Sequence, residues 1–488
     1  MLRRIASVPF SAAIMLASVA LAVLLLLSVT YGGGAPVAAQ TATAPNFVFV
    51  LTDDMRADDL KYMPKTNSLV KNQGMNFTEA FVPTALCCPS RATTMRGQYA
   101  HNTGVWTNVS GPSGGWQGYQ SRGHEQENVA TLLHDAGYRT GLFGKYLNGY
   151  DGTTVPTGWD DWFAMGNPPR YLDYDVNDNG TIKHYGTSAG DYSTNVLSTQ
   201  TQEFIGASVD AGKPFFAYVA PKAPHGPFVP VPGHDFDVAQ APRLPSFNEK
   251  DVSDKPPWIK SLPRLTTTDI ANIDSQHEKR VESLRAVDDL VEDVVNKLQD
   301  AGALGNTYVV FTSDNGWHHG EHRIPKGKAR PYEEDIRIPL LIRGPIVGAG
   351  TTTNKLVLNT DFLPTFTDLA NPANPPTPSY SVDGRSLRPV LTGSATSWRT
   401  AILLEGRKGK DPDVPVDKHH FGIRTSTDKY VEYEGGYREF YNLGTDRYEM
   451  RNAYRSTSPT SVQTGLQTRL QALKGCAGDT CRTAENGP

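Results

Sequence analysis

Two short apolar runs, far apart in the chain, each end in a pair of oxygen-bearing side chains. Residues 45–51 have the sequence PNFVFVL and residues 307–312 have the sequence TYVVFT. Runs of this length, rich in β-branched and aromatic residues, are typical of parallel strands buried on both faces. Open α/β sheets bind ligands at the carboxyl ends of such strands, although a solvated turn is the alternative interpretation of each pair. The side chains in question are Asp53, Asp54, Asp314 and Asn315.

The segments between these runs predict further units of an α/β fold. We expect an amphipathic helix over residues 128–136, followed by a turn and a strand over 137–145. Residues 278–299 carry apolar side chains three or four apart, which predicts a second helix ending at Ala301-Gly302. Residues 215–220 (FFAYVA) predict another buried strand. The expected architecture is a large, mixed but mainly parallel sheet flanked by helices.

Other regions lack this pattern. Residues 151–191 and 227–264 are rich in Gly, Asp, Tyr or Pro and show little periodicity, so we expect two long surface loops. After about residue 397, short strand-like segments alternate with turns, and a helix is expected over 459–474. This predicts a small C-terminal antiparallel sheet with one helix.

The N-terminus and the charge limit where the protein acts and what it binds. Arg3 and Arg4 precede an apolar run, and small residues follow near Ala39, which is typical of a secretory signal over residues 1–39. We therefore expect a secreted, periplasmic or cell-surface protein, with an uncleaved membrane anchor as the alternative. The net charge of −4 argues against a nucleic-acid partner held by a basic surface.

One cysteine-containing stretch carries the most specific signal. Residues 85–97 include Cys87-x-Pro-Ser-Arg91, where a fixed positive charge lies close to a potential nucleophile. Taken alone, the stretch also fits a buried cysteine pair, Cys87 and Cys88, at a turn. It closely resembles the sulfatase signature, however, in which the first Cys is oxidised to formylglycine by a formylglycine-generating enzyme. The resemblance implies that Cys87 is the modified residue.

The resemblance extends over residues 45–450 and implies an alkaline-phosphatase-like α/β fold. It further implies a catalytic domain over 45–396, a C-terminal subdomain over 397–488, and one bound Ca²⁺, with Mg²⁺ as the alternative. The implied metal ligands are Asp53, Asp54, Cys87, Asp314 and Asn315.

Local matches to the family imply further roles. Lys145 and Lys328 would contact the sulfate together with Arg91, while His225 or His318 would protonate the departing oxygen. The chain departs from the family pattern two places after Lys145, where many sulfatases have His and this chain has Leu147. Asn148 is the candidate substitute.

The implied activity is hydrolysis of a sulfate monoester in a small molecule or a sugar. The alternatives are a phosphonate or phosphate ester hydrolase of the same superfamily and a non-catalytic glycan-binding relative. Several stretches resemble the N-acetylglucosamine-6-sulfatase branch, so a sulfated sugar is the expected substrate. Three aromatic residues in the 151–191 region are candidates for stacking on and hydrogen-bonding its ring: Trp159, Trp162 and Tyr171. The alternative for Trp159 and Trp162 is ordinary packing.

The two remaining cysteines are expected to pair. If Cys87 is oxidised and Cys88 stays free, Cys476 and Cys481 can close a small loop near the C-terminus. Such a bridge would fasten the tail and take no part in the chemistry.

Overall fold

The computed structural model describes residues 44–231, 240–407 and 419–487. The expected secretory signal over residues 1–39 lies outside these ranges. None of the helices that the structure describes has both the length and the apolar character needed to cross a bilayer.

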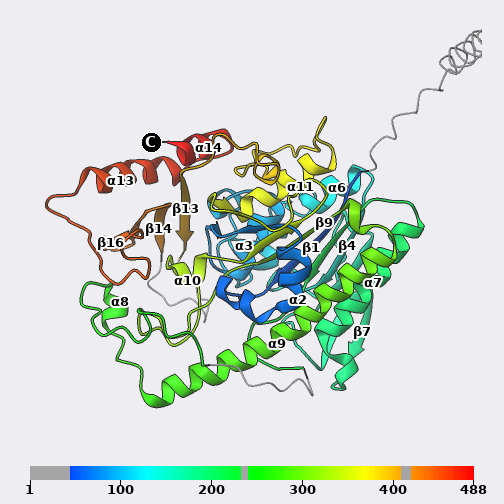
Figure 1. Cartoon of the computed structure of the whole chain (residues 1–488), viewed down its shortest axis with the longest axis horizontal. Coiled ribbons are helices and arrows are strands. Elements are labelled where there is room, and N and C mark those ends of the chain that lie inside the picture. The colour runs from blue at the N-terminus through cyan, green and yellow to red at the C-terminus, as the bar shows by residue number, and fades with distance from the viewer. Residues whose placement is uncertain (1–43, 232–239, 408–418, 488) are drawn as a thin grey trace, which may run out of the picture. The chain divides into compact units, whose positions relative to one another are not determined.

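A mixed sheet forms the centre of the described chain (Figure 1). Its strand order is β11-β2-β10-β9-β1-β8-β4-β5-β6-β7. The five central strands, from β9 to β5, run parallel. Strand β10 is antiparallel to β9, β6 is antiparallel to β5, and β7 is antiparallel to β6. The strands are β1 (Asn46–Thr52), β2 (Met75–Phe77), β4 (Arg139–Gly144), β5 (Asp161–Met165), β6 (Tyr174–Asp178), β7 (Thr181–Tyr185), β8 (Phe215–Ala220), β9 (Thr307–Ser313), β10 (Leu340–Arg343) and β11 (Thr351–Thr353).

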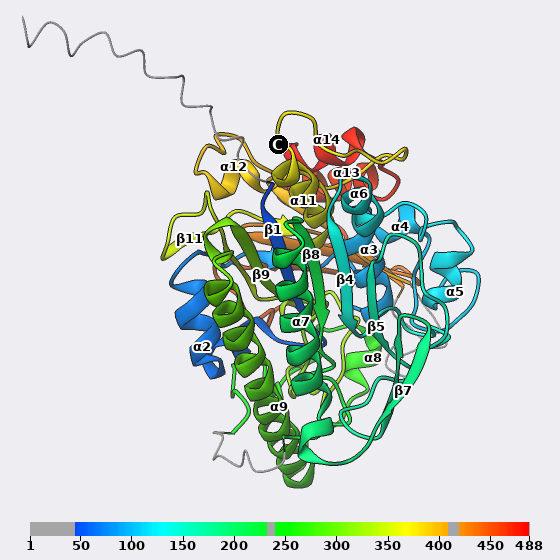
Figure 2. The same ribbon diagram turned by 90° about the vertical axis from the view of Figure 1, so that its right-hand side faces the viewer.

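Helices cover both faces of this sheet. On one face α7 (Ser193–Asp210) and α9 (Thr267–Asp300) lie side by side (Figure 2), and Phe204 and Val287 pack with Val309 of the sheet. On the other face lie α3 (Cys87–Arg96), α6 (Val129–Asp135) and α11 (Phe362–Ala370), which pack against Phe47 and Phe49. Each such buried apolar side chain contributes about 1.5–3 kcal/mol. The central strands β1, β8 and β9 are buried along their whole length because both faces are covered.

The C-terminal region forms a second sheet. Strands β13 (Ala401–Gly406), β14 (His420–Thr425), β15 (Asp428–Tyr433) and β16 (Arg438–Asn442) are antiparallel, with α13 (Ser461–Leu473) and α14 (Asp479–Asn486) beside them (Figure 1). The predicted fold class, a large mainly parallel sheet flanked by helices plus a small antiparallel C-terminal sheet, is confirmed. The helix α14 was not predicted.

The expectation of a long surface loop over residues 151–191 is wrong. Strands β5, β6 and β7 lie there and extend the main sheet. A two-residue turn, Asn179-Gly180, joins β6 to β7, with positive φ at both residues. This dipeptide is a strong hairpin signal in its own right. The apolar alternation around it is weak because β7 is an exposed edge strand.

The three aromatic residues proposed to stack on a sugar are largely buried. Trp162 is fully buried, and Trp159 and Tyr171 are at most 8% exposed. Trp162 packs edge-on against Tyr146, and its indole N–H donates to the Tyr150 hydroxyl at 2.9 Å. Packing is therefore the correct interpretation of both tryptophans.

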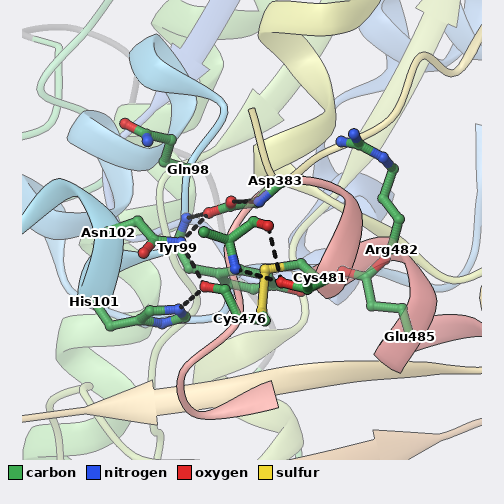
Figure 3. Close-up of a disulfide and its surroundings, with 12 residues drawn as sticks. Gln98, Tyr99, His101, Asn102, Asp383, Cys476, Cys481, Arg482 and Glu485 are labelled. Carbon is green, nitrogen blue, oxygen red and sulfur yellow. Dashed lines mark hydrogen bonds between the residues drawn. A yellow bond between two sulfur atoms is a disulfide. The ribbon is translucent and has the colours of Figure 1, made fainter. Parts of the chain in front are cut away.

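A disulfide joins Cys476 to Cys481, as predicted (Figure 3). It closes the turn between α13 and α14. Hydrogen bonds hold the turn to residues far from it in the chain: Gly478 N donates to Asp383 Oδ1 at 2.7 Å, Asn102 Nδ2 donates to Cys476 O at 2.9 Å, and His101 Nε2 lies 2.9 Å from the same oxygen. The bridge thus fastens the C-terminal tail.

Replacing Trp162 tests its assignment to the core. Trp162→Ala should lower the free energy of unfolding by about 3–5 kcal/mol, because it removes a fully buried indole and its hydrogen bond. Chemical denaturation measures this loss, with Val155→Ala at a 40% exposed position as the control. An undiminished stability combined with a raised KM for a sugar would restore the stacking interpretation.

Candidate functional site

Four adjacent parallel strands end at one edge of the sheet and deliver polar side chains to the same place. In sheet order these are β9, β1, β8 and β4. The pairing of β1 with β9 sets Thr52 opposite Ser313, so that the two acidic pairs that follow are neighbours. Asn315 Nδ2 donates to Asp54 Oδ1 at 2.6 Å, and the Asp54 amide donates to Asp314 Oδ1 at 3.1 Å. The clustering expected from the two strand ends is present.

The first turn of α3 lies against this cluster. Cys87 is its first residue and is fully buried, with Sγ 3.4 Å from Asp53 Oδ1 and 4.0 Å from Asp54 Oδ1. Ser90, in the same turn, donates its hydroxyl to the Asp314 carbonyl at 2.5 Å and accepts from Asn359 Nδ2 at 3.0 Å. These contacts fix the start of α3 over the ends of β1 and β9.

Three buried cations each pair with one carboxylate of the cluster. Lys145 lies 2.6 Å from Asp53, Lys328 lies 2.5 Å from Asp54, and Arg91 lies 2.8 Å from Asp314. Lys328 Nζ also lies 2.7 Å from Cys87 Sγ. All six charged side chains are almost inaccessible to solvent, so each charge depends on its partner.

Burial and pairing act in opposite directions on the pKa values of these groups. Burial alone would raise the pKa of Asp53, but Lys145 and other nearby cations hold it well below its usual value. For Asp314, burial and the charge of Asp53 outweigh Arg91 and raise the pKa to about 6. Burial also raises the pKa of the Cys87 thiol above its usual value. An unmodified Cys87 is therefore a thiol at neutral pH, and a thiol is a poor nucleophile.

Lys145 reaches the site because of the residue before it. Gly144, the last residue of β4, has φ of +113°, and a Cβ there would lie 2.2 Å from the Ala220 carbonyl oxygen of β8. Only glycine allows this close approach.

Leu147 points into the core and is 3% exposed, whereas Asn148 lines the pocket described below and its buried Oδ1 accepts no hydrogen bond. The departure from the family pattern thus leaves an amide at the pocket wall.

The cluster has the donors that a hard divalent cation requires. Asp54 Oδ2 and Asn315 Oδ1 are buried and accept no hydrogen bond. Ligand atoms of Asp53, Asp54, Cys87 and His225 also lie within 4.8 Å of one another. Carboxylate and amide oxygens are the ligands that Ca²⁺ and Mg²⁺ prefer, so these residues fit such an ion. It would compete with the ammonium groups of Lys145 and Lys328 for the carboxylates.

A pocket of about 700 Å³ opens beside the cluster. This volume is typical of small-molecule sites. Cys87 and Lys328 are fully buried and are not part of its wall. The described residues that line it are Asp53, Asn108, Val109, Lys145, Asn148, Asn167, Pro168, Pro169, Arg170, Tyr171, Leu172, Lys222, His225, Gly226, Pro227 and Val229.

The two candidate histidines have different positions. His225 lines the pocket, with Nε2 3.7 Å from Asp54 Oδ2 and Nδ1 2.6 Å from the Gly226 carbonyl oxygen. Because a carbonyl only accepts, this contact places a proton on Nδ1. Burial lowers the pKa of His225 to about 4. His318 is fully buried, does not line the pocket, and bonds Asp335 Oδ1 through Nδ1 at 2.5 Å.

Sequence reasoning missed Lys222, three residues before His225. It lines the pocket although it is only 3% exposed, and burial lowers its pKa to about 8. The sequence did contain a signal for it. Lys222 follows the buried strand that ends at Ala220, and the neighbouring strands end in side chains that enter the site.

Comparisons with known proteins agree with this geometry. A family model described as sulfatase matches residues 45–372, and one described as the C-terminal part of N-sulphoglucosamine sulphohydrolase matches residues 320–475. The N-acetylglucosamine-6-sulfatase of Capra hircus is 33% identical, covering 91% of this chain and 86% of that protein. A putative extracellular sulfatase Sulf-1 homolog of Caenorhabditis elegans is 35% identical, covering 75% of this chain and 53% of that protein.

A solved structure shares the fold. It is that of BT4656 in complex with its substrate D-glucosamine-2-N,6-O-disulfate, with a TM-score of 0.72. It is 24% identical and covers 91% of this chain and 99% of that chain.

Proposed function

The chain belongs to the sulfatase family and hydrolyses sulfate esters, and from that premise we propose that its substrate is a carbohydrate carrying 6-sulfated glucosamine or N-acetylglucosamine. The observation that carries the proposal is the neighbourhood of Cys87, where three buried cation–carboxylate pairs lie beside an open pocket. The similarity to N-acetylglucosamine-6-sulfatase over most of both chains favours a 6-sulfated sugar within the class.

Cys87 is proposed to act as formylglycine, made by a formylglycine-generating enzyme. Its Sγ then stands where an oxygen of the hydrated aldehyde would lie. The hydrate supplies one hydroxyl as a nucleophile for sulfur and a second hydroxyl whose deprotonation expels sulfate. The raised pKa of the thiol supports this choice, because an unmodified side chain would be protonated.

Asp53, Asp54, Asp314 and Asn315 are proposed to hold one Ca²⁺ next to residue 87. The ion supplies positive charge that favours an ionised hydroxyl and offsets the charge of the ester. The unpartnered oxygens of Asp54 and Asn315 support this assignment. Lys145 and Lys328, which contact Asp53 and Asp54, would donate to the sulfate oxygens if a metal ion bound those carboxylates. Arg91 pairs with Asp314 and orients its carboxylate.

His225 is proposed to protonate the departing sugar oxygen. It lines the pocket, and its Nε2 faces Asp54. With the Nδ1 proton held by Gly226, Nε2 can donate only from the imidazolium form, which an anionic ester in the pocket favours. His318 is the second candidate, since its Nε2 is buried and accepts no hydrogen bond.

Residues 397–488 are proposed to form a subdomain that holds the Lys328 loop in place. Lys429 Nζ donates to the Pro331 carbonyl at 2.9 Å, and the Tyr332 hydroxyl donates to Glu439 at 2.8 Å. We also propose secretion through the N-terminal signal, which the extracellular relative supports.

The first prediction concerns Cys87. Cys87→Ala should lower kcat/KM for sulfate esters by about 10³-fold or more, because it removes the nucleophile. Peptide mass spectrometry of the active wild type should find the aldehyde at residue 87. Cys88→Ala is the matched control, because Cys88 is also fully buried but lies at the next position. Fully active enzyme with an intact thiol at residue 87 would exclude this mechanism.

The second prediction concerns the metal. Elemental analysis should find about one calcium per chain, because the proposed shell contains three carboxylates and one amide. Added Ca²⁺ should raise the Tm of chelator-treated protein, and Asp54→Ala should abolish that increase. Asp210→Ala, at an exposed position, serves as the control. Stoichiometric zinc without calcium or magnesium would contradict the assignment.

The third prediction concerns the substrate. N-acetylglucosamine 6-sulfate should be hydrolysed with a kcat/KM roughly tenfold or more above that for galactose sulfates, because the pocket must match the sugar's hydroxyl pattern. An aryl sulfate and an aryl phosphonate are measured in the same buffer. Turnover of the aryl sulfate without release from any sugar would overturn the substrate and leave the family activity standing. Preference for the phosphonate would favour the related ester hydrolase activity.

A further inference from the structure

Lys222 differs from the other buried cations of the site in its partners. Lys145, Lys328 and Arg91 each pair with a carboxylate within 2.8 Å. Among the residues that the structure describes, no carboxylate lies within ion-pair distance of Lys222. A buried ammonium group without a counter-charge is costly unless an anion is supplied from elsewhere.

The hydrogen bond to Gly226 fixes the Lys222 ammonium group and leaves two of its N–H donors unused. Its Nζ donates to the Gly226 carbonyl oxygen at 2.7 Å, the same oxygen that accepts from His225 Nδ1. Its distance of 3.4 Å from His225 Nδ1 is therefore that of two donors sharing one acceptor. An ammonium has three N–H donors, so two remain after the bond to Gly226.

Ordered side chains surround Lys222 in the wall of the pocket. Nζ lies 5.5 Å from the centre of the Tyr171 ring, and the Tyr171 hydroxyl donates to the His225 carbonyl at 2.8 Å. Arg170, the neighbour of Tyr171, lines the same pocket and has only a 3.5 Å contact with Asp173. Of the described lining residues, Asp53 is the only carboxylate, and Lys145 already neutralises it.

Lys222 and Asp54 contact different nitrogens of the His225 ring. The nucleophile and the metal donors lie on the Nε2 side of His225, toward Asp54, whereas Lys222 contacts the Nδ1 side. If His225 protonates the departing oxygen, Lys222 faces the sugar that leaves with that oxygen.

We propose that Lys222 is a specificity residue that binds a second anionic substituent, an N-sulfate or a carboxylate, on the leaving sugar. Arg170 at the rim of the pocket assists it. The inference rests on the proposed function, because it assumes a sulfated sugar in this pocket. It predicts that the enzyme prefers glucosamine derivatives with a second negative charge over those with a neutral N-acetyl group.

The test compares D-glucosamine 2-N,6-O-disulfate with N-acetyl-D-glucosamine 6-sulfate in one buffer. The wild type should prefer the disulfated sugar, and Lys222→Met should reduce the ratio of the two kcat/KM values about tenfold, mainly through KM, because a charge-assisted hydrogen bond is lost. Lys222→Gln is the second variant in case the first does not fold, and Lys213→Met at an exposed position is the control. No preference in the wild type, or an equal loss on both sugars with a fall in kcat, would overturn the proposal in favour of a role in positioning His225.

A separate measurement tests anion binding by Lys222 if neither sugar is a substrate. If both sugars are inert while an aryl sulfate is hydrolysed, glucosamine N-sulfate is used as a competitive inhibitor of aryl sulfate turnover. Lys222→Met should then raise its inhibition constant about tenfold relative to wild type, for the same reason. An unchanged inhibition constant would contradict anion binding by Lys222.

Discussion

The buried charge at the ends of β1 and β9 is the constraint on which the rest of the site depends. Taking a carboxylate or an ammonium group out of water costs several kcal/mol, and only a close partner offsets that cost. Asp53, Asp54 and Asp314 are therefore tolerated only because Lys145, Lys328 and Arg91 reach them. Each cation comes from a different element, so that strands, helix and loop must all be in place before the charges balance.

This balance also explains how the fold prepares an anion site. A sulfate ester brings negative charge into a region that already holds three carboxylates, so it needs donors that can change partners. In the proposed mechanism, Lys145 and Lys328 would do so if a divalent ion bound their carboxylates. Arg91 is held from two sides, by Asp314 and by the Lys145 carbonyl, and is more suited to fixing the site than to leaving its partner.

Much of the fold could be predicted because its central strands are covered on both faces. Residues 45–51, 215–220 and 307–312 are mostly apolar, and each forms a buried strand. Helix α9 starts at Thr267 rather than near residue 278, because its first turns are polar and the periodicity appears only where the helix packs on the sheet. The Thr266–Asp269 capping box marks the true start.

The sequence indicated which carboxylates would lie together near Cys87, but it did not indicate how the charges pair. Strand ends and the resemblance located the carboxylates and Cys87, but no local pattern indicates that Lys145 faces Asp53 and Lys328 faces Asp54. Lys222 was missed because its importance comes from the absence of a nearby carboxylate, which only the described contacts reveal.

The central claim is that the side chain at residue 87 attacks sulfur and needs its second hydroxyl to release sulfate. Cys87→Ser tests it most directly, because a serine can accept the sulfate but has no second hydroxyl with which to expel it. After incubation with a sulfate ester, mass spectrometry of the variant should find about one sulfate bound to residue 87 per chain, with no multiple turnover. Sustained turnover by this variant, or substrate consumption with no sulfate at residue 87, would contradict the account.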